Sequence, residues 1–403
     1  MTNLQPRGNP VVIVLASLGL LALAGLPFLR VAPNRLVSGE PIYFLSSLST
    51  LSNPQILSGP ALLLALVVMA VVAVFASGFV RQGRALHSAV LVATAAFILG
   101  QLGWAAFVAQ QLMQAQTSLG RVSLGSAFWA SSVLMALLAN DALQRLGATP
   151  LQKAVVGLTV LALLGALLAS GWCNDLSIMK EYANRTDGFA VAIGQHLQIV
   201  GLAMAFTLGI GLPLGWAAHA NQQVAKLVFP ALNVVQTIPS IALFGLLMAP
   251  LALLAASVPA LGALGISGVG MAPAVIALTL YGLLPVVRGT LAGLQQVSTA
   301  QINAARALGL KPWTVLRHVR LPLALPVVMG GVRTAAVAAV GLAAVTALIG
   351  AGGLGSILFE GLFSNAQDVV LLGVLPIVGL GVLVDVMFSA LTAMAVKQAA
   401  PHA

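Results

Sequence analysis

The chain has 403 residues, of which 60% are hydrophobic and only 6% are charged. Soluble domains carry roughly 25% charged residues, so this composition excludes a water-soluble enzyme and also a disordered or fibrous chain. The formal net charge of +10 comes from 18 basic and 8 acidic residues spread over short polar segments, which favours a membrane protein over a nucleic-acid-binding one. A single cysteine and five histidines without close pairing predict neither an internal disulfide nor a metal site.

Apolar runs long enough to cross a bilayer recur along the chain and predict about ten membrane spans. They lie near Val11–Leu29, Pro60–Val80, Ser88–Leu112, Val122–Leu138, Ala154–Cys173, Gln195–Ala218, Leu227–Ala255, Ala272–Val287, Leu323–Leu348 and Val369–Ala393. We read the first run as an uncleaved span, because it is longer than the apolar part of a usual signal peptide and no small-x-small cleavage site follows it. A signal peptide is the alternative.

The distribution of basic residues predicts which segments face the cytoplasm. With a cytoplasmic N-terminus, inner segments hold 12 of the 18 basic residues: Arg7, Arg81, Arg84, Arg145, Lys153, Lys226, Arg288, Arg306, Lys311, Arg317, Arg320 and Lys397. Outer segments hold fewer basic residues and most of the carboxylates: Arg30, Arg35, Arg121, Lys180, Arg185, Glu40, Asp175, Glu181, Asp187, Glu360 and Asp368. This bias agrees with the positive-inside rule, so we expect both termini in the cytoplasm.

The chain divides into two halves of different character. Residues 1–188 contain five plain apolar runs and end in the polar stretch Asn174–Gly188, whereas residues 189–403 contain five runs interrupted by proline, glycine and amide side chains. Irregular backbone is tolerated within a bilayer only where it lines a cavity or is buried in protein. We therefore expect the second half to be the working part of the protein.

The inner segment Gln295–Pro322 is long enough to fold, and its spacing predicts two short helices. The first is expected over Thr299–Leu308, and Gly309 ends it because glycine adopts the left-handed conformation without a Cβ penalty. Pro312 begins the second helix and Pro322 ends it. The apolar face of the first helix is expected to consist of Ile302, Ala305 and Leu308. Such a basic projection either binds anionic lipid head groups or docks into a soluble partner.

The same segment resembles the EAA loop of bacterial ABC importer permeases, whose pattern is Glu-Ala-Ala, three residues, Gly, nine residues, Ile-x-Leu-Pro. Here Asn303-Ala304-Ala305 ends three residues before Gly309, and Val319-Arg320-Leu321-Pro322 begins after nine more. The resemblance implies a coupling loop seated on an ATP-binding subunit and formed by Asn303, Ala304, Ala305, Gly309, Leu321 and Pro322. Asn303 replaces the usual glutamate, and an amide cannot make the charge-assisted hydrogen bond, roughly twice as strong as a neutral one, that a carboxylate makes.

Further patches resemble permeases of the glycine betaine, carnitine and choline importers. In the second half these patches are Val234–Ser240, Leu278–Arg288 and Ala347–Gly355. In the first half, Ala32–Glu40 and Asn174–Arg185 resemble the long YehY-type permease of that branch. The resemblance therefore extends over nearly the whole chain.

This resemblance implies an all-α, polytopic membrane helix bundle of the bacterial inner membrane, with an N-terminal extension at 1–188, a type I ABC importer permease core at 189–403 and a coupling loop at 295–322. The chain has no Gly-x4-Gly-Lys-Ser/Thr phosphate loop, so we expect a transport subunit that is not an enzyme and binds no cofactor itself, with ATP and Mg²⁺ on a partner ATPase. The implied partners are two copies of a cytoplasmic ABC ATPase, a second permease subunit (identical or different) and an extracytoplasmic solute-binding protein, within a lipid bilayer and without nucleic acid.

Polar side chains of the seventh run are candidates for the transport pathway. Four of them recur at spacings that share one helix face: Asn233, Gln236, Thr237 and Ser240. We interpret Gln236, Thr237 and Ser240 as pathway-lining, and hydrogen bonding between helices is the alternative. Tyr281 is a further candidate, because aromatic faces attract a quaternary ammonium group. Trp216 and Phe244 offer the same chemistry, and all three aromatic side chains are equally compatible with packing inside the bundle.

Glycines and charges in the last two runs are ambiguous. The glycines Gly350, Gly352, Gly353 and Gly355 form either a gate or a plain turn at the outer end of the ninth run. Arg333 lies about two turns inside that run, and we favour snorkelling toward the interface over pairing. Asp385 is a candidate counter-ion of Arg288 or Arg333, or of a quaternary ammonium, and we favour the structural role.

We therefore expect the permease subunit of an ATP-driven importer of glycine betaine or a related quaternary-amine solute. An ABC importer of another solute, such as methionine or a different amino acid, is the nearest alternative. An ion-gradient-driven secondary transporter and an integral-membrane enzyme belong to other classes, and the sequence has no cluster of His, Asp, Glu or Cys placed for catalysis.

Overall fold

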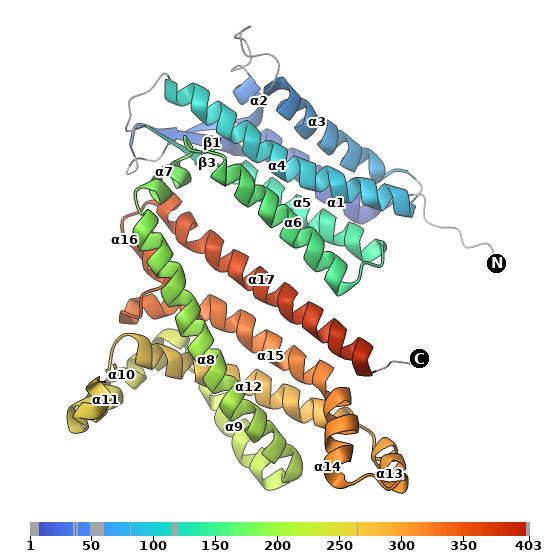
Figure 1. The fold of residues 1–403 in the computed structure, drawn as a ribbon. Coiled ribbons are helices and arrows are strands. Elements are labelled where there is room, and N and C mark those ends of the chain that lie inside the picture. Colours follow the sequence, from blue (N-terminus) through green and yellow to red (C-terminus); the bar gives the residue numbers. More distant parts are fainter. Residues whose placement is uncertain are drawn as a thin grey trace, which may run out of the picture. The chain divides into compact units, whose positions relative to one another are not determined.

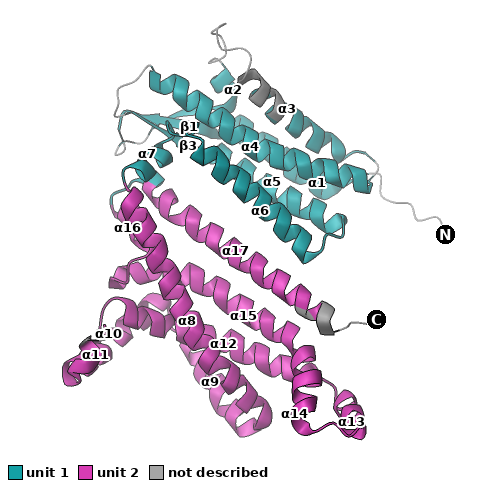
Figure 2. Cartoon of the chain, in the orientation of Figure 1, with its two compact units in different colours: residues 1–184, 364–368 teal, residues 185–363, 369–403 magenta. Residues whose placement is uncertain are grey.

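The computed structural model describes residues 8–34, 37, 39–48, 60–80, 82–114, 120–263 and 265–399. Arg7, Arg35 and Arg81, which enter the expected orientation, lie outside the described residues, as do both chain ends. The chain forms two compact units (Figure 2): unit 1 comprises residues 1–184 and 364–368, and unit 2 comprises residues 185–363 and 369–403.

Unit 1 is a helix bundle with a small antiparallel sheet (Figure 1). Its elements are α1 (Pro10–Gly25), β1 (Pro27–Ala32), β2 (Glu40–Tyr43), α2 (Phe44–Ser47), α3 (Pro60–Ser77), α4 (Arg84–Gln114), β3 (Arg121–Leu124), α5 (Ser126–Arg145), α6 (Pro150–Ala169) and α7 (Ser177–Ala183). The sheet has the strand order β2-β1-β3.

The two strands β1 and β3 occupy positions that the sequence assigned to membrane spans. The first span was expected to reach Leu29, but α1 stops at Gly25, since Pro27 has no N–H to continue the helical hydrogen bonds. The fourth was expected from Val122, which instead belongs to β3. Both expected boundaries are wrong by a few residues, because apolar strand residues that are buried in protein have the same hydropathy as a span.

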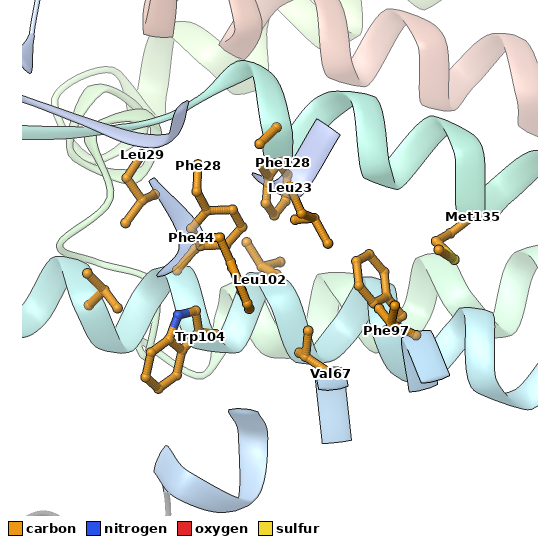
Figure 3. Packing of buried hydrophobic residues seen from close by; sticks show 14 of the residues in the cluster. Leu23, Phe28, Leu29, Phe44, Val67, Phe97, Leu102, Trp104, Phe128 and Met135 are labelled. Atoms are coloured by element: carbon orange, nitrogen blue, oxygen red, sulfur yellow. The ribbon is translucent and has the colours of Figure 1, made fainter. Parts of the chain in front are cut away.

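The core of unit 1 joins the sheet to the helices (Figure 3). Phe28 of β1 and Trp104 of α4 are fully buried. The rings of Phe28 and Phe44 meet edge to face, with centroids 5.2 Å apart. Trp104 Nε1 donates a hydrogen bond of 3.0 Å to Ser47 Oγ, so the buried indole N–H is satisfied. The sheet is therefore a fixed part of the unit.

Unit 2 is built from helices alone among its described residues. Its elements are α8 (Thr186–Ala220), α9 (Gln222–Thr237), α10 (Ser240–Ser257), α11 (Pro259–Ala263), α12 (Met271–Gln296), α13 (Thr299–Ala307), α14 (Pro312–Val315), a π-helical turn (Leu316–Arg320), α15 (Leu321–Ala343), a 3₁₀ turn (Val345–Ile349), α16 (Leu354–Phe363) and α17 (Gln367–Ala399, which enters unit 2 at Val369).

The helix α12 lies between α8 and α15 and packs against both. Small residues allow this close approach: a Cβ on Gly215 of α8 would meet Thr290, and one on Gly331 of α15 would meet the Pro285 carbonyl. Within a bilayer, helices associate through such close packing, because lipid gives no hydrophobic drive between them.

Eight helices of the described residues are long and apolar enough to cross a membrane, and shorter apolar helices accompany them. The ten expected runs correspond to α1, α3, α4, α5, α6, α8, α9 with α10, α12, α15 and α17. The seventh run is divided at Ile238 and Pro239, because the residue before a proline is held in the extended region.

Candidate transport pathway and coupling loop

The segment Gln295–Pro322, predicted to be a coupling loop, forms a helical hairpin whose turn is fixed by its own backbone. α13 ends in a Schellman motif: Gly309 N–H donates to the Arg306 carbonyl at 2.9 Å and Leu310 N–H donates to the Ala305 carbonyl at 3.4 Å. Gly309 has φ +78°, the left-handed conformation predicted from the sequence. At the other end of α13, Ser298 and Gln301 form a capping box. The predicted first helix and its stop are confirmed.

The second helix does not end at Pro322, so that prediction is wrong. α14 continues through the π-helical turn into α15, in which Leu321 and Pro322 are the first two residues. Pro322 lacks an N–H for the preceding turn, and the wider turn, where Leu321 N–H donates to the Leu316 carbonyl, accommodates the ring. The hairpin is thus continuous with a membrane span.

The hairpin has a packed face and an exposed face. Ile302 and Ala305 are buried in a cluster with Leu294 and Val297 at the end of α12. Leu308, expected on the same face, is 80% exposed, because the helix ends at Ala307 and the chain turns away. The exposed side of the hairpin includes Asn303, Ala304, Arg306, Lys311 and Trp313. A surface that combines exposed apolar side chains with cations is typical of a docking site.

A cavity of about 330 Å³ separates part of the hairpin from the end of α8. Its lining includes Trp216, Trp313, Arg306 and Arg320. Trp216 packs against the cluster under the hairpin, so it contributes to packing at this end of the unit. The hairpin is therefore held firmly on α12 and α15 and more loosely beside α8.

The division between α9 and α10 lies against α12. Gln236 Nε2 donates to the Tyr281 carbonyl at 2.7 Å, and the Tyr281 hydroxyl donates to the Ile238 carbonyl in the division itself. The structure thus brings two of the candidate pathway residues together. Thr237 instead donates to the Val234 carbonyl of its own helix, and Ser240 starts α10. Phe244 is only 1% exposed and belongs to the packed interior.

A polar face remains exposed beside this division. Asn233, Gln236 and Thr237 are exposed, and Arg288 Nη2 of α12 donates to Asn233 Oδ1 at 3.2 Å. Polar groups in a spanning segment face protein or a water-filled route, because hydrocarbon offers them no hydrogen bonds. This face can therefore line a route for a polar solute.

Of the four candidate gate glycines, three form a tight turn against α8, and Gly355 is the second residue of α16. Gly350, Gly352 and Gly353 have φ between +78° and +79°. Gly353 N–H donates to Gln195 Oε1 at 3.0 Å, and a Cβ on Gly355 would overlap the Ala344 carbonyl. Backbone conformation and close packing both require glycine here. Gln195 was not predicted to contact this turn, although an amide in an apolar run was a usable signal.

Arg333 and Asp385 form a bidentate ion pair between α15 and α17. Arg333 Nε lies 2.6 Å from Asp385 Oδ1, and Nη2 lies 2.7 Å from Oδ2. Snorkelling, the favoured reading for Arg333, is therefore wrong, since a two-bond contact with a carboxylate satisfies the guanidinium in place. The structural role favoured for Asp385 fits this geometry. Within the described residues, no group of three or more His, Cys, Asp or Glu side chains is placed to hold a metal ion.

A bundle of membrane-spanning helices, a polar face along a divided helix and a projecting hairpin continuous with a span define a membrane permease. Residues 208–394 match the family described as binding-protein-dependent transport system inner membrane component, and residues 7–179 match the family described as ABC transporter permease YehY, N-terminal domain. The osmoprotectant import permease protein OsmW of Salmonella typhimurium is 40% identical over 191 residues, which cover 47% of this chain and 84% of that protein. The chain belongs to the permeases of binding-protein-dependent ABC importers.

Two further similarities concern a second permease and a solved structure. The glycine betaine/carnitine/choline transport system permease protein OpuCB of Bacillus subtilis is 33% identical over 192 residues, which cover 48% of this chain and 81% of that protein. A crystal structure of the MetNI methionine ABC transporter in inward-facing conformations is 25% identical with a TM-score of 0.44, over 51% of this chain and 95% of that one.

Proposed function

We propose that the chain is the permease subunit of an ATP-driven importer of glycine betaine or a related quaternary-amine compatible solute in the bacterial inner membrane. The similarity to permeases named for osmoprotectants, glycine betaine, carnitine and choline carries the proposed substrate class. A permanently charged ammonium group cannot cross hydrocarbon unaided, and the exposed face at Asn233, Gln236 and Thr237 offers polar contacts along the spans.

The proposed coupling acts through the hairpin. Two copies of a cytoplasmic ABC ATPase bind ATP and Mg²⁺ and grip the exposed side of α13 and α14, where Asn303 supplies an amide in place of a carboxylate. Closure of the ATPases moves the hairpin. The π-helical turn passes this movement to α15, and the buried cluster at Ile302 and Leu294 passes it to α12. The glycine turn at Gly350–Gly355 closes the opposite end of the route.

A second permease subunit and an extracytoplasmic solute-binding protein complete the proposed assembly. In a single chain the polar face beside α12 is exposed, and a second subunit encloses it. The proposed orientation has both termini in the cytoplasm and requires the start of α1 and the end of α5 to lie on one side of the membrane. Asn9 Nδ2 donates to Asp141 Oδ2 at 3.0 Å and Arg145 Nη2 donates to Asn9 Oδ1 at 3.1 Å. The start of α1 and the end of α5, both expected on the inner side, therefore lie together.

Uptake measurements test this proposal. The permease, its ATPase and its solute-binding protein are expressed together in cells that lack other betaine transporters, and uptake of labelled glycine betaine and of labelled methionine is compared. We expect betaine uptake that stops when ATP is depleted and persists when an uncoupler collapses the ion gradient. Uptake of methionine alone, or uptake that depends only on the gradient, contradicts the proposal.

A further inference from the structure

The register of the small sheet in unit 1 places two arginines on one face. Arg30 of β1 lies opposite Ser123 of β3, and Ala32 lies opposite Arg121. Opposed and alternate residues share a face, so Arg30, Ala32, Arg121 and Ser123 point to the same side. Leu29 and Val122, on the other face, are fully buried in the core, and the partly buried Val31 packs against the same core. One face of the sheet is therefore apolar and packed, and the other is polar and basic.

This basic face forms the floor of a small polar pocket of about 60 Å³. Asp368, which the chain brings back into unit 1 before α17 continues, also lines it. Asp368 Oδ2 accepts a hydrogen bond of 2.5 Å from Ser123 Oγ. Three segments far apart in the sequence, near residues 30, 121 and 368, thus build one site. All three are expected on the outer side of the membrane from the distribution of basic residues.

The cations of the pocket are not fully matched by the protein. Arg121 lies 3.8 Å from Glu181, and its buried Nε atom has no hydrogen-bond partner. Arg30 is partly buried and makes no hydrogen bond or ion pair with the part of the chain that the structure describes. The lining contains two guanidinium groups and the Asp368 carboxylate, which accepts a hydrogen bond from Ser123. Glu181 lies beside Arg121, so Arg30 is the cation of the lining that has no partner among the described residues. A guanidinium that faces a polar pocket without a partner is suited to bind an anion.

The volume restricts the size of this anion. A cavity needs roughly 10–15 Å³ to hold one water, so the pocket has room for a carboxylate group. It is much smaller than the pockets of about 300–1,000 Å³ that enclose whole small molecules. A free quaternary-amine solute therefore leaves most of its surface outside, whereas an acidic side chain carried on a protein surface needs only its carboxylate inside.

We propose that this pocket is a carboxylate-binding site whose occupant is an Asp or Glu side chain of the extracytoplasmic solute-binding protein, held chiefly by Arg30. The inference rests on the proposed function for its partner and for the side of the membrane. It assigns to the N-terminal unit a role in docking that partner, separate from the transport pathway of unit 2.

Docking of the solute-binding protein to the full permease–ATPase complex in lipid nanodiscs tests this assignment. The probe is the purified binding protein of the same transport system, and its half-saturating concentration is read from binding and from stimulated ATP hydrolysis. We expect Arg30→Gln to raise the half-saturating concentration about tenfold, because one charge-assisted hydrogen bond is lost. The half-saturating concentration should also depend less on salt. Arg30→Lys, which retains the charge, should have a smaller effect. Arg84→Gln, at an exposed arginine of the same unit and expected on the inner side, is the matched control.

The possible outcomes distinguish a failure of the docking pocket from a failure of the proposed function. If Arg30→Gln docks the binding protein like the wild type while the thermal unfolding midpoints agree, the proposed docking role of the pocket is overturned. If acetate at constant ionic strength protects Arg30 from modification by phenylglyoxal but docking does not depend on Arg30, the site binds a free carboxylate and the protein occupant is wrong. If the wild-type complex neither docks a binding protein nor responds to one, the proposed function itself fails.

Discussion

Replacement of Gly309 by alanine tests whether the turn of the hairpin sets ATPase docking. Gly309 has φ +78°, and a Cβ added there would meet no atom within 4 Å, so the substitution adds no clash. The whole cost is that of a non-glycine residue in the left-handed region, about 1–2 kcal/mol. If the hairpin leaves its native turn to relieve this cost, the population competent for docking falls by a factor of about 5–30. We expect ATPase affinity and solute uptake to fall together within that range.

Gly147 provides a control with the same local chemistry. It ends α5 in an equivalent Schellman motif, in which Gly147 N–H donates to Gln144 and Ala148 N–H donates to Leu143, with φ +67° and no atom within 4 Å of an added Cβ. Gly147→Ala should therefore cost a similar folding free energy without weakening ATPase docking. Gly309→Asn should be milder than Gly309→Ala, because asparagine tolerates the left-handed region. The assay is titration of the ATPase onto the permease in nanodiscs, together with betaine uptake.

Wild-type affinity of Gly309→Ala for the ATPase would contradict the proposed role of the turn. An equal loss of affinity in Gly147→Ala and Gly309→Ala would also contradict it, since the effect would then be one of general folding and not of the hairpin.

Three further outcomes follow from the contacts. Asp385→Asn should lower the free energy of unfolding by about 1–2 kcal/mol. This is less than the roughly 3–5 kcal/mol lost from a fully buried pair, because both side chains are about 40% exposed. In thermal unfolding, adding Arg333→Gln should cause little further loss of stability, and fully additive losses would show that the pair is not coupled. Tyr281→Phe removes the hydrogen bond to the Ile238 carbonyl, so uptake should fall severalfold at unchanged ATPase affinity, and unaltered uptake would exclude a role for this contact in the pathway. Burial raises the pKa of the Cys173 thiol from 9.0 to about 11, so the folded protein should resist maleimide at pH 7 and react once denatured. Because the thiol of the unfolded chain ionises at a lower pH, the stability that depends on Cys173 is complete below about pH 9 and is lost as the pH rises toward about 11. Unfolding curves of the wild type and of Cys173→Ala, measured across this pH range, test this loss. Prompt maleimide labelling of the folded protein would contradict the burial of the thiol.

Local features of the fold were predictable from the sequence. Gly309 and Pro312 set the ends of the two hairpin helices, because a left-handed stop and a first-turn proline act through their own backbone. The prediction that Pro322 ends a helix was wrong, because a π-helical turn accommodates the proline within a continuous helix. The local sequence pattern does not distinguish such a proline from one that ends a helix.

Non-local features were not predictable from one sequence. Hydropathy assigned β1 and β3 to spans, because a strand buried in protein is as apolar as a helix buried in lipid. The partner of Arg333 was left open, since only the packing of α15 against α17 brings Asp385 within bonding distance. The role of Gln236 and Tyr281 in transport stays a prediction. The contact between them depends on how α9 meets α12, which the sequence alone does not give.

The way the chain threads residues 364–368 back into unit 1 bears on how this protein can be shortened. Asp368 accepts a hydrogen bond from Ser123 of the sheet and is also the second residue of α17. A truncated protein that consists of the C-terminal half alone would therefore lose the hydrogen bond from Ser123 that holds the beginning of its last span. The first two residues of that helix, Gln367 and Asp368, belong to the N-terminal unit, so this unit is not a detachable appendage.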